Sequence, residues 1–327
     1  MNAKLALNRM VDAIRLQHLS WSTEQCYLGW TRRYIAFLQQ RRSDGTSERK
    51  FEAYLTHLAR EVDVSATTQN QAFNALRYFY AHGVGQPLGD VQALRAKRRQ
   101  HERMAPSVEQ VCALRAALVD TPSTPARLLV DLLYGCGLRV SEPIELRVRD
   151  LLWAESQLII RDAKGAKDRR VPLPCSLVAA LRAQVARARV AWEWDRAQAP
   201  AVGAPLPHRL ARKYPAAPFA WSWFWVFPAP GHCRHPRTGE RVRFHLLDSA
   251  LQRAVKTAAA RAGLAGLVTP HCLRHAYATH QLQRGEDLKT IQTVMGHVSL
   301  ETTAGYLHAD VRRASNPLDV LAPAVTP

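Results

Sequence analysis

Residues 271–306, HCLRHAYATHQLQRGEDLKTIQTVMGHVSLETTAGY, carry the pattern from which the fold and the chemistry of the chain are predicted. Apolar residues recur through this stretch at helical steps, and breaks are expected at Gly285 and at Gly296. In the first helix, His271 and Arg274 stand at i and i+3, so both side chains belong to one helical face. The stretch is therefore predicted to be helical and to present an imidazole beside a guanidinium.

A small β-hairpin is predicted nearer the N-terminus. Residues 157–162 and 169–173 have the composition of two short strands, joined at 163–168 by a polar turn with lysines at its tip. Helices are expected from the N-cap Ser107 to about Leu118, over 126–134 and over 176–194. The proline- and tryptophan-rich stretch from about 197 to 245 then behaves like an inserted module.

The first 94 residues are predicted to form a separate helical domain. Apolar residues recur at steps of three and four through residues 27–38 and again through 73–80. This aromatic stripe is interpreted as core rather than as a platform for stacking bases. The whole chain is therefore expected to be mainly α-helical with a small β-hairpin, and its second domain spans 107–327.

The charge of the chain indicates a nucleic-acid partner. Lysine and arginine number 45 against 27 acidic residues, which gives a formal net charge of +18. Residues 95–106 concentrate this charge in a basic linker between the two domains. Its Lys97, Arg98 and Arg99 fit either a solvated charge run or contacts to duplex phosphates, and the second interpretation is favoured.

Membrane proteins, disulfide-rich proteins and metal proteins fit the sequence poorly. No apolar run reaches the length of a membrane span, and the N-terminus lacks the pattern of a signal peptide, so we expect a cytoplasmic, nucleoid-associated protein. The six cysteines have no CxxC pairing, which favours reduced thiols. His232, Cys233 and His235 lack a second ligand pair at zinc-site spacing, so no metal is assigned.

Four separated elements together resemble the catalytic set of the tyrosine recombinases. They are Gly137-Leu-Arg139-Val-Ser-Glu142, a lysine in the hairpin turn, His271-x-x-Arg274, and Gly296-His297 with a tyrosine nine residues later. The resemblance covers essentially the whole second domain. It implies a two-domain clamp around DNA that works as a homotetramer without a cofactor, and the catalytic residues would be Arg139, Lys164, His271, Arg274, His297 and Tyr306.

These residue types suit phosphodiester chemistry without a metal ion. Two guanidiniums, Arg139 and Arg274, can hold the non-bridging oxygens of a phosphate on which negative charge gathers. An unperturbed phenol is hardly ionised at neutral pH, so His271 is expected to move the proton of Tyr306. By the resemblance, Lys164 is the general acid for the leaving 5′ oxygen, with Lys167 as a local rival. By the same resemblance, Tyr306 forms a 3′-phosphotyrosyl bond that a freed 5′ hydroxyl reverses.

His297 and Glu142 are expected to assist this chemistry. His297 should hydrogen-bond the scissile phosphate, whereas Glu142 is interpreted as an orienting group rather than a reactant. His275, His280 and His308 are interpreted as structural or exposed.

Within that family, the inserted module resembles the integron integrases. The resemblance rests on Leu210-Ala-Arg-Lys-Tyr-Pro215, Trp221-Ser-Trp-Phe-Trp-Val-Phe-Pro228 and Ser249-Ala-Leu-Gln-Arg-Ala-Val-Lys256. It implies recombination of gene cassettes at folded single-stranded hairpin sites and at a duplex attachment site. Bases bulging from such a hairpin need flat partners, and the candidates are Trp221, Trp223 and His245.

Two features leave that assignment open. The tryptophans at 221, 223 and 225 fit a short strand that packs a core equally well, and Phe244-His245 stands where the branch tends to place two histidines.

Three alternatives remain at this point. A recombinase of the Xer or phage type would act on duplex sites only, a type IB topoisomerase would relax supercoils, and a non-catalytic DNA-binding protein would have a decayed active site. The inserted module disfavours the first, and the intact set of catalytic residue types disfavours the last.

Overall fold

The structure is a computed structural model that describes residues 3–41, 45–89, 91, 105–163, 167–206 and 210–296. The chain divides into two compact units, residues 1–102 and 103–327. Six of the predicted site residues lie outside the described residues: Lys97, Arg98, Arg99, Lys164, His297 and Tyr306. Within the described residues, no helix has the length and apolar content needed to cross a membrane.

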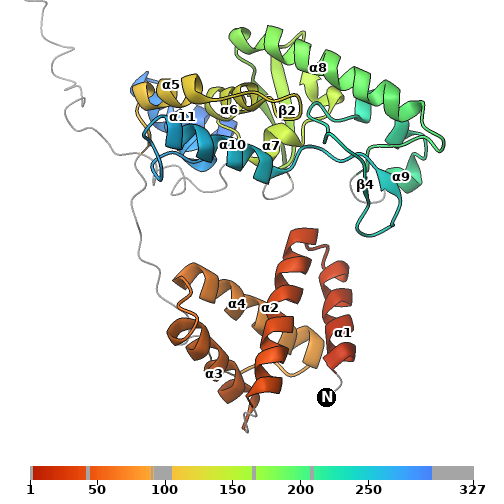
Figure 1. Cartoon of the computed structure of the whole chain (residues 1–327), viewed down its shortest axis with the longest axis vertical. Helices are drawn as coiled ribbons and strands as arrows, with labels where there is room; N and C mark the ends of the chain where they lie inside the picture. Colours follow the sequence, from red (N-terminus) through yellow and green to blue (C-terminus); the bar gives the residue numbers. More distant parts are fainter. Residues whose placement is uncertain are drawn as a thin grey trace, which may run out of the picture. The chain divides into compact units, whose positions relative to one another are not determined.

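The first unit is a helical bundle, as the sequence predicts. Its elements are α1 (Ala3–Leu16), α2 (Trp21–Gln40), α3 (Ser47–Arg60), α4 (Ala66–Tyr78) and the π-helix η1 (Phe79–Val84) (Figure 1). Three helices begin at hydroxyl N-caps, because Ser20, Thr46 and Ser65 each accept a hydrogen bond from a backbone N–H of the first turn. The aromatic stripe is core: Tyr34 and Phe73 are at most 1% exposed.

The second unit begins with helices and a small antiparallel sheet close to their predicted positions. Its order is α5 (Val108–Ala117), α6 (Ala126–Gly135), α7 (Ser141–Ile144), η3 (Val148–Asp150), β1 (Leu151–Leu152), β2 (Gln157–Ala163), β3 (Lys167–Pro172) and α8 (Cys175–Arg196). Ser107 forms a capping box with Gln110, which confirms the predicted start of α5. The sheet has the strand order β1-β2-β3, and the short β1 was not predicted.

The remainder of the second unit returns to helices after a segment with little regular structure. It contains α9 (Leu210–Lys213), η4 (Ala217–Phe219), η5 (Trp221–Trp223), β4 (Cys233–Arg234), β5 (Arg241–Val242), α10 (Asp248–Arg261), α11 (Pro270–Gln283) and α12 (Leu288–Met295). Helices α5, α6, α10 and α11 lie together in Figure 1, and Leu114, Leu129, Val255 and Leu273 are among the residues of their shared core.

The tryptophans of the segment 197–245 do not form the short strand that one interpretation of the sequence allows. Residues 221–223 form a 3-10 turn, and only Trp225 of the three is fully buried, with its Nε1 donating to the carbonyl of Arg243. A buried charge cluster joins this segment to α8. The Asp195 carboxylate, which has no exposed surface, accepts hydrogen bonds from the Arg243 guanidinium and lies 2.6 Å from Nε2 of His232.

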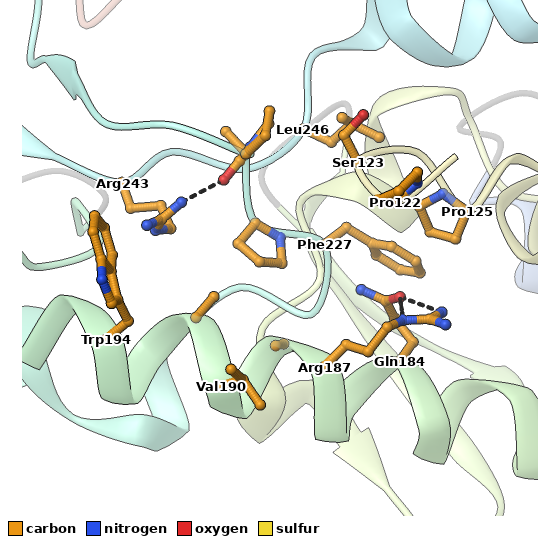
Figure 2. A pocket seen from close by; sticks show the side chains of 15 residues that line it. Pro122, Ser123, Pro125, Gln184, Arg187, Val190, Trp194, Phe227, Arg243 and Leu246 are labelled. Carbon is orange, nitrogen blue, oxygen red and sulfur yellow. Dashed lines mark hydrogen bonds between the residues drawn. The ribbon is translucent and has the colours of Figure 1, made fainter. Parts of the chain in front are cut away.

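The Arg243 side chain also closes one end of a cavity over α8. Arg243 donates to the carbonyl of Ala229, and Trp194 stands beside it at the edge of the cavity (Figure 2). Val190 and Trp194 are 68% and 52% exposed at this surface.

The Asp195 cluster predicts a large stability difference within one helix. Asp195→Ala leaves a buried guanidinium without its carboxylate and should lower the free energy of unfolding by about 3 to 5 kcal/mol. The control Glu193→Ala, on the same helix, removes an exposed carboxylate paired with Arg189 and should cost no more than about 0.5 kcal/mol. Denaturant unfolding measures both variants, and similar losses would contradict a structural role for the cluster.

Candidate functional site

The Glu142 carboxylate lies at the centre of a cluster of arginines. Its Oε1 accepts from Nη1 of Arg139 at 2.7 Å and from Nη1 of Arg169 at 2.9 Å. Its Oε2 accepts from the backbone N–H of Arg139 at 2.7 Å and from Nη2 of Arg169 at 2.6 Å, and lies 3.8 Å from Nη1 of Arg274. One carboxylate therefore holds two guanidiniums directly and faces a third.

The charge balance of this cluster favours an anionic ligand. Burial of Glu142 alone would raise its pKa, but the hydrogen bonds and charge of Arg169, with the bonds from Arg139, outweigh burial and hold the pKa below its ordinary value. Glu142 is thus ionised at neutral pH. A single negative charge among three guanidiniums leaves the cluster positive, which suits a phosphate group.

The same three arginines cap the C-terminal end of α12. Arg169 Nε donates to the carbonyl of Val294 at 2.7 Å, Arg274 Nη2 to that of Met295 at 2.6 Å, and Arg139 Nη2 to that of Gly296 at 3.2 Å. The last carbonyls of a helix lack partners within the helix and carry partial negative charge, so cations stabilise them. The helix end that directly precedes His297 is therefore fixed by the arginine cluster.

Two glycines allow the backbone to approach this closely. Gly296 has φ +65°, and a Cβ there would lie 2.9 Å from Cδ of Arg169. Gly137 has φ +62°, and a Cβ there would lie 2.5 Å from the Tyr277 ring on α11. Its carbonyl accepts from Arg274 Nη1 at 2.6 Å, which ties the start of the Gly137–Glu142 motif to α11.

Three of the six predicted catalytic residues are described, and the structure brings all three together. Arg139, His271 and Arg274 line one cavity of about 740 Å³ between α10, the start of α11 and residues 138–141. Arg274 is 2% exposed, whereas His271 is exposed at the first turn of α11. The expected common face of His271 and Arg274 is thus present.

Arg169 is a member of the cluster that the sequence analysis missed. A signal was available, because side chains alternate across a strand and Arg169 shares a face with Val171, which is fully buried. A buried arginine at that position requires a buried acceptor, and Glu142 is that acceptor.

A second group of residues surrounds a cavity of about 350 Å³ that Trp223 and His245 line with Arg147 and Arg149. The Arg149 guanidinium carbon lies 3.6 Å from the Trp223 ring centroid. His245 Nδ1 donates to the carbonyl of Leu246 at 2.7 Å, which makes Nε2 the acceptor of the neutral ring. Burial lowers the pKa of His245 despite that bond, so the ring is neutral at pH 7.

Trp221 differs from Trp223. Its ring packs against Trp192 and Phe224, with centroid distances of 5.7 and 6.1 Å, as part of a small core beneath the segment. The structure therefore places Trp223 and His245 together at one cavity, whereas the partly buried Trp221 packs against Trp192 of α8 and Phe224.

Two further histidines, His280 and His235, make hydrogen bonds of a structural kind. His280 Nδ1 lies 2.8 Å from the Tyr134 hydroxyl, and Nδ1 of His235 accepts from two backbone N–H groups of its own turn. In the described part of the chain, no group of three or more His, Cys, Asp or Glu is placed to hold a metal ion.

Comparison with known proteins gives consistent matches over both units. The pattern of the Phage integrase family matches residues 107–313, and that of the Phage integrase, N-terminal SAM-like domain, matches residues 6–90. An Integrase/recombinase of Escherichia coli is 39% identical over 97% of this chain and 94% of its own length. Tyrosine recombinase XerD of Agrobacterium fabrum is 33% identical over 78% of this chain and 74% of its own length.

Solved structures share the fold at low sequence identity. XerH site-specific recombinase, bound to palindromic difH substrate, aligns with a TM-score of 0.59 at 16% identity over 91% of this chain and 79% of its own. A lambda integrase dimer bound to a COC′ core site aligns with a TM-score of 0.60 at 16% identity over 95% and 96%.

Substitution of Gly296 should separate backbone strain from the contact with Arg169. Gly296→Ala and Gly285→Ala both place a side chain at positive φ, which costs about 1 to 2 kcal/mol. Only Gly296→Ala also forces the arginine to move, because a Cβ at Gly285 meets nothing within 4 Å. Gly296→Ala should therefore lower the melting temperature more than Gly285→Ala. Equal shifts would show that the close approach at Gly296 has no energetic weight.

Proposed function

We propose that Tyr306 is the nucleophile of this chain and that Arg139 and Arg274 clamp the scissile phosphate. The premise is that the chain belongs to the phage integrase family and is a tyrosine site-specific recombinase, an enzyme that breaks and rejoins DNA. The observation that carries this proposal is the positive cluster around Glu142, in which Arg139 and Arg274 both line one cavity. Tyr306 attacks the phosphorus, a 3′-phosphotyrosyl bond forms and the 5′ oxygen leaves. The bond energy is kept in the intermediate, so the step needs no ATP.

The other predicted groups complete this chemistry. His271, exposed beside Arg274, accepts the Tyr306 proton, and Lys164 supplies the proton to the leaving oxygen. His297 follows the helix end held by the arginines and hydrogen-bonds the phosphate. The basic linker at 95–106 neutralises backbone phosphates through Lys97, Arg98 and Arg99, and four protomers act on two sites.

We propose further that this recombinase is an integron integrase that moves gene cassettes at folded single-stranded hairpin sites as well as at a duplex site. The cavity lined by Trp223, His245 and Arg149 supports this assignment, because an extrahelical base can stack on the Trp223 ring or the Arg149 guanidinium while His245 Nε2 accepts a hydrogen bond. The phenyl ring of Phe244 adds a flat surface without a hydrogen-bonding group.

Arg274→Lys tests the phosphate clamp. A lysine keeps the charge but cannot donate to Gly137 and Met295 and to a phosphate in one fixed plane, so covalent adduct formation should slow by about 100- to 1,000-fold. The Kd for DNA should change less than threefold. Arg284→Lys, an exposed position at the end of the same helix, is the control and should behave as the wild type. A near-normal rate for Arg274→Lys would overturn the clamp.

The hairpin assignment is tested by comparing Trp223→Ala with Trp221→Ala. One lost base stack is worth about 1 to 3 kcal/mol, so Trp223→Ala should weaken binding of a hairpin with extrahelical bases by roughly 5- to 100-fold and leave the matching duplex unaffected. Trp221→Ala removes packing and should lower the melting temperature and both affinities in proportion. Equal losses on both DNAs for Trp223→Ala would favour an enzyme that acts on duplex sites only.

A further inference from the structure

Arg169 makes a set of contacts that no step of the proposed reaction uses. Its guanidinium forms a two-pronged pair with Glu142, at 2.9 and 2.6 Å, and its Nε donates to the carbonyl of Val294 at 2.7 Å. The side chain is 8% exposed. Arg169 lies on β3, so it joins the hairpin strand to the Glu142 turn and to the end of α12.

We propose that Arg169 is a positioning residue for strand cleavage, which holds the Arg139 guanidinium and the end of α12 in the geometry that the scissile phosphate needs. The proposal rests on the proposed function, because it requires that Arg139 binds that phosphate. Arg169 is not assigned as a phosphate ligand, because it is not among the residues that line the cavity shared by Arg139, His271 and Arg274.

The hydrogen-bonding capacity of the Glu142 carboxylate is fully used. A carboxylate offers about four lone-pair positions, and four N–H groups occupy them here, two from Arg139 and two from Arg169. Because all four positions are occupied, the Glu142 carboxylate is held in one orientation. Arg139 is therefore held at a fixed rotation, which leaves the rest of its guanidinium for a ligand.

Loss of the two hydrogen bonds from Arg169 would change which arginine Glu142 binds. With two lone-pair positions vacated, the buried carboxylate needs another donor. Arg274 Nη1 is 3.8 Å from Oε2, and a small rotation of Glu142 would bring the two into contact. Glu142 would then compete with the phosphate for Arg274 and release Arg139 from its fixed orientation. A displacement of about 1 Å in such a site can cost 100-fold in rate.

The experiment uses the full chain with Arg169→Lys and measures adduct formation in a single turnover. The substrate is a nicked duplex, whose site is selected from random-sequence DNA by covalent capture with the wild-type protein. Adduct formation should slow by about 30- to 300-fold, with the Kd for that duplex within threefold of the wild type. An unchanged rate would overturn the proposal.

Arg243→Lys is the matched control, because Arg243 is 3% exposed and likewise forms a two-pronged pair with a buried carboxylate and donates to a carbonyl. It should lower the melting temperature as much as Arg169→Lys does while leaving the cleavage rate of the duplex within threefold. If Arg243→Lys slows cleavage equally, the effect of Arg169→Lys is one of stability and the proposal fails.

A protein that already carries Arg139→Lys distinguishes a positioning role of Arg169 from a general loss of active-site structure. Because part of its effect passes through Arg139, Arg169→Lys should slow cleavage by a smaller factor in a protein that already carries Arg139→Lys than in the wild-type protein. Full additivity of the two losses would contradict the proposal. Failure of the wild-type protein to capture any DNA would instead contradict the proposed function, so the two failures are distinguishable.

Discussion

The Glu142 carboxylate, 7% exposed and shared by Arg139 and Arg169 with Arg274 at 3.8 Å, is the group on which the arrangement of the second unit depends. Three guanidiniums could not lie this close without a negative charge between them, and a carboxylate this buried could not remain ionised without the arginines. Each partner comes from a different element: Arg139 precedes α7, Arg169 lies on β3 and Arg274 on α11. A single carboxylate thus lies where three segments that are distant in the sequence meet.

The helix end at Gly296 completes this arrangement. Val294, Met295 and Gly296 each offer a carbonyl to a different arginine, so α12 ends where the positive charge is greatest. The end of α12, which directly precedes His297, is therefore held in a fixed position, although the arginines that hold it lie between residues 139 and 274 of the sequence. The cluster has little freedom to adapt, and its remaining positive charge is available to a phosphate.

Local features of this fold were predictable from sequence, and long-range ones were not. The Ser107 cap, the hairpin over 157–173 and the helix carrying His271 and Arg274 follow from patterns within a few residues. The interpretation of Glu142 as an orienting group is consistent with its hydrogen bonds from Arg139. Its second partner, Arg169, is not predictable in this way, because strand alternation indicates a buried side chain without naming its acceptor.

The contacts of the tryptophan-rich segment 197–245 likewise could not be predicted from the sequence. Spacing gave no means to distinguish Trp221 from Trp223, since their difference depends on Trp192 of α8 for the first and on Arg149 for the second. Likewise, the Asp195–Arg243 pair joins residues 48 positions apart, and only the folded chain brings them together.

The proposed covalent bond joins Tyr306, which follows the arginine cluster in the sequence, to DNA. It is tested most directly by trapping the wild-type protein on a nicked duplex, digesting both components and locating the nucleotide-bearing peptide by mass spectrometry. We expect one modified peptide, with a nucleotide joined through its 3′ phosphate to Tyr306. Linkage through a 5′ phosphate, or to any other residue, would contradict it.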